Sequence, residues 1–148
     1  MKSASEIENS EVRALARRAE SFVAGCRWCA EVRSCAAAFA IAGVVGVFRV
    51  DLTPVRPDVD STVWVVVGDI PPAYIAFDDG DDWQDALRGY TDEMQKWVDA
   101  VRAGASIEEL VPVNVSPTRE HAEILAGRLQ FIRDRLVNVD PASLESDV

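Results

Sequence analysis

Three cysteines and a single histidine are the residues of this chain best suited to redox or metal chemistry. Cys26 and Cys29 form a Cys-x-x-Cys pair, Cys35 follows, and His121 is the only histidine. Reactive pairs of this kind sit at a helix N-terminus after a strand, where the helix dipole lowers a thiol pKa. Here the pair falls late in a predicted helix, a position typical of small core residues. Structural zinc usually has two close ligand pairs, and a site made of these four residues would have only one. Zinc binding and redox use of the cysteines are kept as alternatives.

Carboxylates gather in one turn, whose sequence is Asp78-Asp-Gly-Asp-Asp82. Oxygen ligands of this kind suit Ca²⁺ or Mg²⁺, but the spacing of Asp78, Asp79, Asp81 and Asp82 does not match an EF-hand loop. The turn precedes a predicted helix, and a helix N-terminus favours negative charge. We therefore expect a solvated turn that caps the helix and offers an acidic patch to a basic partner, with no bound metal.

Asp69 and Tyr74 form a second candidate binding site. Asp69 follows an apolar strand and precedes Pro71 and Pro72, so we expect its carboxylate to be partly buried. A buried carboxylate needs hydrogen bonds or a cation, because burial otherwise raises its pKa. Asp is also a common turn residue, and capping the turn at the strand end is the simpler interpretation. The functional interpretation places Asp69 beside Tyr74 in a pocket at the sheet edge.

Familiar catalytic signatures are absent from the sequence. A Ser-His-Asp or Cys-His arrangement would have to use His121, and no Gly-x-Ser-x-Gly motif supplies a serine. Neither of the phosphate-binding patterns Gly-x-Gly-x-x-Gly and Gly-x-x-x-x-Gly-Lys occurs. The sequence therefore predicts no catalytic residue and no cofactor.

Charge and hydropathy restrict the partners of this chain. Its 148 residues include 15 Lys and Arg against 25 Asp and Glu, a net charge of −10. Nucleic acids and anionic membranes are bound by basic side chains, so we expect neither as a partner. A basic protein or a second copy of the chain is compatible with the acidic balance. The longest apolar run, 36–48, is shorter than the about 20 residues that span a bilayer, and the odd number of cysteines favours the cytoplasm.

Hydrophobic periodicity predicts three helices and three to four strands, in the order α-β-β-β-α-α. We expect helices from Ser10 through Val32, from Asp82 to Gly104, and from Ser116 and Pro117 to about Val137. We expect strands at Ala38–Leu52, Thr62–Gly68 and Ala73–Phe77, with a fourth at the sheet edge at Val111–Val115. The β-branched run Thr62–Gly68 should be central and covered on both faces, and Asp69–Pro72 should interrupt the ladder.

An α+β fold follows from this order. A small antiparallel sheet packed on one face by the three helices, in two layers, is the simplest arrangement that buries the apolar stripes. The length fits a single domain over residues 1–148. We expect the polar ends, 1–10 and 140–148, to be flexible.

The segment Trp64-Val-Val-Val-Gly-Asp-Ile-Pro-Pro-Ala-Tyr-Ile75, followed by a tryptophan-bearing helix, resembles small bacterial proteins of unknown function. Those proteins carry a Trp-x-x-x-Gly-Asp-Leu-Pro-x-x-Tyr segment within a similar order of elements. The resemblance implies a stand-alone bacterial domain and brings no activity with it.

Three functional hypotheses follow. The leading one is a non-enzymatic interaction module, immunity-like or an adaptor, that binds a basic partner through the acidic turn 78–85. The second is a small enzyme or small-molecule binder with a pocket around Asp69 and Tyr74. The third is zinc or redox use of the cysteines.

Overall fold

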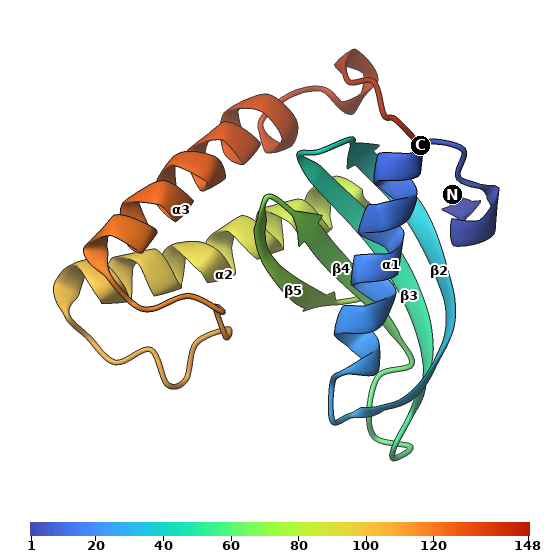
Figure 1. The fold of residues 1–148 in the computed structure, drawn as a ribbon, viewed down its shortest axis with the longest axis horizontal. Helices are drawn as coiled ribbons and strands as arrows, with labels where there is room; N and C mark the ends of the chain where they lie inside the picture. The colour runs from blue at the N-terminus through green and yellow to red at the C-terminus, as the bar shows by residue number, and fades with distance from the viewer.

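The computed structural model describes all 148 residues, which form one five-stranded antiparallel sheet and three α-helices (Figure 1). The strands, adjacent in chain order, are β1 Lys2–Ser3, β2 Cys29–Ile41, β3 Val45–Pro54, β4 Thr62–Gly68 and β5 Ile70–Ala76. The helices are α1 Ser10–Ala24, α2 Trp83–Ala103 and α3 Arg119–Ile132, with a π-helical turn at Arg133–Val137 and 3-10 turns at Ala4–Glu6 and Pro141–Ser143. None of the helices is long and apolar enough to cross a membrane.

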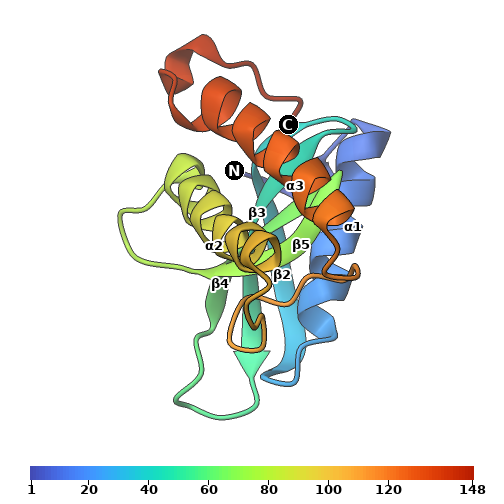
Figure 2. The same ribbon diagram turned by 90° about the vertical axis from the view of Figure 1, so that its left-hand side faces the viewer.

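The α+β class is confirmed, but the helices cover both faces of the sheet (Figures 1 and 2). α1 packs across β2, β3 and β4 on one face, whereas α2 packs on the other face and α3 packs on α2. The expectation of two layers, with all helices on one face, is therefore wrong. The cause is that β3 and β4 are apolar on both sides, and each side of such a strand has to be covered.

Two hydrophobic clusters, one on each face, hold the layers together. Alternation along β3 directs Phe48 and Val50 toward α1, and Val45 and Val47 toward α2. The largest fully buried side chain, Trp97, lies in the α2 cluster. Since its indole N–H has no hydrogen-bond partner, packing alone fixes this ring.

The strand prediction Thr62–Gly68 is confirmed, because β4 has these bounds and lies between β3 and β5. The predicted strand Ala38–Leu52 is wrong, because it joins parts of two strands that meet in a hairpin. The hairpin turns at Gly43, whose φ of +75° is a conformation that glycine adopts readily. The segment Asp69–Pro72 interrupts the ladder only locally: β5 already begins at Ile70, but its register with β4 shifts between Val66 and Gly68, opposite the two prolines. The prolines are tolerated since β5 is an edge strand.

The helix prediction for α2 is confirmed. Asp82 caps its N-terminus, and Gly104 takes a φ of +66° at its C-terminal end. α3 starts later than predicted, since Thr118 and not Ser116 is its N-cap. The strand predicted at 111–115 is an irregular segment.

α1 is shorter than predicted. Asn9 accepts hydrogen bonds from its first turn, and the helix ends at Ala24 rather than continuing through Val32. The chain leaves the helix at Gly25, a residue with low helix propensity, and β2 starts at Cys29. The Cys-x-x-Cys pair therefore spans a turn between helix and strand and does not lie within a helix.

Both ends of the chain, 1–10 and 140–148, make specific contacts with β2. β1 pairs with β2, and Ile7 is only 3% exposed. Near the C-terminus, the Asp147 N–H donates to the Ala40 carbonyl at 2.8 Å, and the Asp147 carboxylate accepts from the Ala42 N–H at 2.7 Å. These contacts cover part of the outer edge of β2.

Candidate functional site

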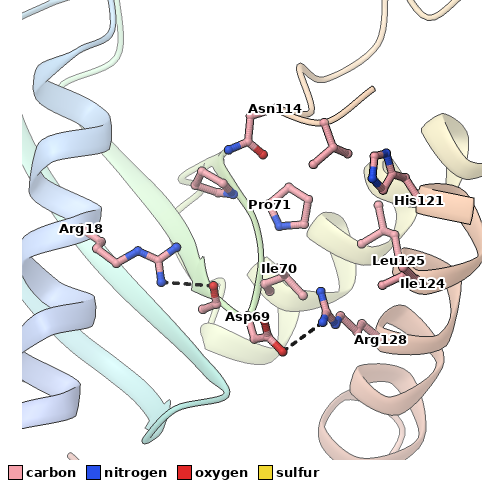
Figure 3. A pocket seen from close by; sticks show the side chains of 12 residues that line it. Arg18, Asp69, Ile70, Pro71, Asn114, His121, Ile124, Leu125 and Arg128 are labelled. Carbon is pink, nitrogen blue, oxygen red and sulfur yellow. Dashed lines mark hydrogen bonds and ion pairs between the residues drawn. The ribbon is translucent and has the colours of Figure 1, made fainter. Parts of the chain in front are cut away.

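Two cavities lie at opposite ends of the edge strand β5. The first, which we call the Asp69 cavity, has a volume of about 370 Å³ and lies between α1, the start of β5 and α3 (Figure 3). Its polar lining consists of Arg18, Asp69, Asn114, His121 and Arg128. Three separate elements thus contribute its charged side chains.

The charged side chains of the Asp69 cavity are engaged within the chain. Arg18 Nη1 donates to the Gly68 carbonyl at 3.1 Å, and Arg128 Nη2 lies 3.3 Å from Asp69 Oδ2. The Asp69 side chain is 70% exposed, so the expected partial burial is wrong: its side chain points to solvent between the buried residues Gly68 and Ile70. His121 Nδ1 lies 2.7 Å from the Ser116 carbonyl. Asp69 thus offsets the charge of Arg128, whereas Arg18 is engaged only by a neutral backbone carbonyl.

Backbone contacts hold the turn that carries Asp69. The Asp69 N–H donates to the Val44 carbonyl in the β2–β3 hairpin at 3.0 Å. The Tyr90 hydroxyl donates to the Pro71 carbonyl at 2.6 Å. Tyr90 is fully buried, and this burial raises its pKa, so the phenol stays a hydrogen-bond donor. The turn is therefore anchored to both layers, which places Asp69 at a strand end, as the turn interpretation predicts.

The second cavity, which we call the Tyr74 groove, runs beside the second half of β5 and has a volume of about 580 Å³. One wall comes from α2 and the other from the connection between α2 and α3. Its lining includes the carboxylates Asp92, Glu93 and Glu109, and contains no Lys, Arg or His. Every charged residue that lines the groove is therefore acidic.

Tyr74 itself faces the α1 side of the sheet. Its ring packs edge-on against Trp28, with ring centroids 4.8 Å apart, and the side chain is half exposed. Asp69 lines the cavity at the start of β5, and Tyr74 lines the groove at its other end. The structure does not bring these two predicted site residues into a common pocket.

The acidic turn is exposed, and part of it forms the predicted helix cap. Asp82 accepts from the Asp85 N–H at 2.9 Å, and Asp85 accepts from the Asp82 N–H at 3.0 Å. The hydrogen bond from the Asp82 backbone lowers the pKa of Asp85. Asp78, Asp79 and Asp81 take part in no ion pair. These three carboxylates are free to interact with a partner.

The cysteines and His121 do not form a common site. The three cysteines lie in the turn after α1 and along β2, whereas His121 lies at the start of α3 in the other layer. No three His, Cys, Asp or Glu side chains gather in a way that could hold a metal ion. Burial raises the pKa of both Cys26 and Cys29, the opposite of what a reactive thiol needs. The geometry thus gives the zinc and redox alternatives no support.

The buried thiol of Cys35 should make the fold sensitive to alkali. Burial, together with the charge of Glu20, raises the pKa of Cys35 from 9.0 to about 12. A folded-state pKa above the unfolded value means that its stability contribution is present below pH 9.0 and is lost as pH rises toward 12. We expect a loss of about 2 kcal/mol in the free energy of unfolding between pH 8 and 10.5 from this group alone.

Urea denaturation of wild type and Cys35→Ala at several pH values measures this contribution. The variant should lose less stability with rising pH than the wild type, whatever the difference between their free energies of unfolding at neutral pH. Cys26→Ala is the control, since Cys26 is only partly buried and should leave the alkaline loss nearly intact. Parallel curves for wild type and Cys35→Ala would contradict the assignment to Cys35.

Sequence patterns do not single out the carboxylates of the Tyr74 groove. Asp92 and Glu93 look like the ordinary polar flank of α2, and Glu109 lies in a connection without a motif. Only the fold places them beside β5, so no local signal could have found them. Comparison with known proteins adds no further guide, since no family model, curated protein or solved structure matches this chain.

Proposed function

We propose that this chain is a non-enzymatic interaction module that binds a basic segment of a partner protein in the Tyr74 groove. The observation that carries the proposal is the lining of the groove, which contains three carboxylates and no basic residue. Carboxylate oxygens accept short, charge-assisted hydrogen bonds from Lys and Arg, which are stronger than neutral ones. A basic protein segment is also the kind of partner that the net negative charge of the chain favours.

The groove carboxylates are open to such a partner. Asp92 and Glu109 form no ion pair within the chain. Glu93 Oε1 lies 2.9 Å from Lys96 Nζ on the same helix, and the Lys96 side chain is 59% exposed. Exposed pairs of this kind contribute little to stability, so a guanidinium from the partner can replace Lys96.

The acidic turn supports the same class of partner from the N-terminal end of α2. Its free carboxylates Asp78, Asp79 and Asp81 add to the field of a chain with net charge −10. Such a field attracts a basic partner at long range and speeds association more than it strengthens the complex. The proposal places the module in the cytoplasm, where its free cysteines would stay reduced.

Neutralising the groove should weaken binding of a short peptide with alternating Arg and Val residues. The triple variant Asp92→Asn, Glu93→Gln and Glu109→Gln should raise the Kd on the order of tenfold, since each exposed ion pair contributes roughly 0.2–1 kcal/mol. Isothermal titration calorimetry at low salt measures both Kd values. Added salt should weaken binding to the wild type, because it screens the charges.

A second triple variant, Asp78→Asn, Asp79→Asn and Asp81→Asn, is the matched control. It removes the same number of negative charges from the acidic turn and leaves the groove intact. We expect its Kd to stay within about threefold of the wild type, because distant charges act mainly on the association rate. Equal weakening by the two triple variants would mean that net charge alone attracts the peptide. That result, or no binding to the wild type, would overturn the proposal.

A further inference from the structure

We infer that the bound segment adds a sixth strand to the sheet at β5 and carries its basic side chains at every second position. The inference rests on the proposed function and deepens it by naming the conformation and sequence pattern of the ligand. An extended segment that joins an open sheet edge gains main-chain hydrogen bonds, and contacts to alternate side chains give specificity. Two observations carry it: the free hydrogen-bonding groups of β5 and the charge on one side of its edge.

The direction of the backbone groups of β4 follows from its pairing with β3. The Leu52 N–H donates to the Ser61 carbonyl at 2.9 Å, one step beyond the last paired residues of the two strands. In an antiparallel ladder, hydrogen-bonded pairs alternate with pairs that are not bonded. Trp64 and Val66 therefore turn their N–H and C=O groups away from β3 and toward β5.

The outward-facing backbone groups of β5 belong to Tyr74 and Ala76. Ile75 and Ala73 are the register partners of Trp64 and Val66, whose backbone groups point toward β5. Ile75 and Ala73 therefore form the backbone hydrogen bonds that join β5 to β4. Tyr74 and Ala76 then point their N–H and C=O groups out of the sheet, and no backbone–backbone hydrogen bond from another part of the chain reaches them. Pro72, which has no N–H, falls on the same outward side, as a proline in an edge strand does.

The two faces of an added strand would meet different surfaces. α2 brings Asp92 and Glu93 alongside β5 on one face of the sheet. Tyr74 points to the other face, where it contacts Trp28. Successive side chains of a strand alternate between faces. Basic residues therefore belong at every second position, with apolar or aromatic residues between them.

The opposite edge of the sheet is less suited to pairing. β1 covers β2 at Ala36 and Ala37, and the C-terminal tail bonds to Ala40 and Ala42. The uncovered part of β2, 29–35, contains two register shifts. Bulges of this kind twist an edge away from a neighbouring chain, so the regular half of β5 is the better site.

N-methylation of the alternating Arg–Val peptide tests strand addition. A methyl group on a peptide nitrogen removes a hydrogen-bond donor and leaves charge and side chains unchanged. One version is methylated at every Arg and the other at every Val. Since alternate residues of a strand direct their N–H groups to the same edge, only one version removes the donors that face β5. That version should bind at least about tenfold more weakly than the unmodified peptide, and the other should stay within about threefold.

The identity of the sensitive version gives the strand direction. In an antiparallel pair, peptide residues opposite Tyr74 share its face and form the bonds, so methylation at Val is the damaging change. Methylation at Arg would instead be the damaging change in a parallel pair. Hydrogen exchange supplies an independent measure, because the peptide should protect the amides of Tyr74 and Ala76.

The outcomes separate the strand from the proposed function. Equal binding of both methylated versions, equal weakening of both, or unchanged exchange at Tyr74 and Ala76 would overturn the sixth strand. Each of these results is compatible with a basic segment held in the groove by charge alone. Failure of the unmodified peptide to bind would reject the proposed function as well.

Discussion

Replacing Gly68 with alanine is expected to lower the free energy of unfolding by about 4 kcal/mol. Gly68 ends β4 with a φ of +149°, which L residues rarely adopt. An added Cβ would overlap the Val44 carbonyl oxygen and lie 2.8 Å from the Val45 Cα. Both contacts are backbone atoms of the β2–β3 hairpin, which also accepts the Asp69 N–H, so neither moves without breaking other bonds. The melting temperature should fall by about 10 °C.

Two further glycines separate the causes of this loss. Gly127 in α3 has no atom within 4 Å of an added Cβ, and Gly127→Ala should be neutral or stabilise by up to about 1 kcal/mol, because alanine favours helix. Gly104 also faces open space but has a φ of +66°, so Gly104→Ala measures the positive-φ cost alone, about 1 kcal/mol. Thermal and urea denaturation compare the three variants. A loss of stability in Gly68→Ala no larger than that in Gly104→Ala would contradict the close approach of Gly68 to the β2–β3 hairpin.

The elements that the sequence predicts well are those with local signals. β4 is a short β-branched run bounded by a turn, so its limits follow from composition. α2 combines an apolar stripe with a capping residue, Asp82, and a terminal glycine, Gly104. The capping residue marks the start of the helix and the glycine marks its end. Neither element needs knowledge of what packs against it.

The errors arise where a distant part of the chain decides the structure. The apolar run 36–48 has no polar interruption, so periodicity cannot show that it folds back on itself at Gly43. Two of the expectations from the sequence also contradict each other. A strand at Thr62–Gly68 that is covered on both faces needs helices on both sides of the sheet, whereas the two-layer arrangement puts all helices on one side. An apolar helix stripe indicates that a helix packs against something, but not against which face of the sheet.

The candidate site is predictable only in part for the same reason. The exposed acidic turn and the position of Asp69 at a strand end follow from local turn chemistry. The Tyr74 groove is built from β5, α2 and the connection that follows, so residues between 74 and 112 meet only after folding. Tyr74 is found from the sequence, whereas the carboxylates that give its groove a charge are not.

Gln84→Glu is expected to lower the free energy of unfolding by about 3 kcal/mol at pH 7. Gln84 is 8% exposed, and its Nε2 donates to the Leu136 carbonyl at 2.9 Å and to the Val139 carbonyl at 3.0 Å. These two bonds tie the start of α2 to the π-helical turn that follows α3 and to the segment just after that turn. An ionised glutamate has no proton to donate, so it would place a negative charge against two carbonyl oxygens.

Acid should restore part of that stability, because a protonated glutamate can donate one hydrogen bond. Burial beside carbonyl oxygens raises the pKa of the introduced carboxyl in the folded state, so the stability gained by protonation is present at low pH and lost as pH rises. Urea denaturation should therefore show a smaller gap between variant and wild type near pH 4 than at pH 7. Gln84→Leu lacks both donor and charge, and should lose about 2 kcal/mol independently of pH. A Gln84→Glu gap that does not change with pH would mean that this side chain reaches water, and that packing alone joins α2 to the turn after α3.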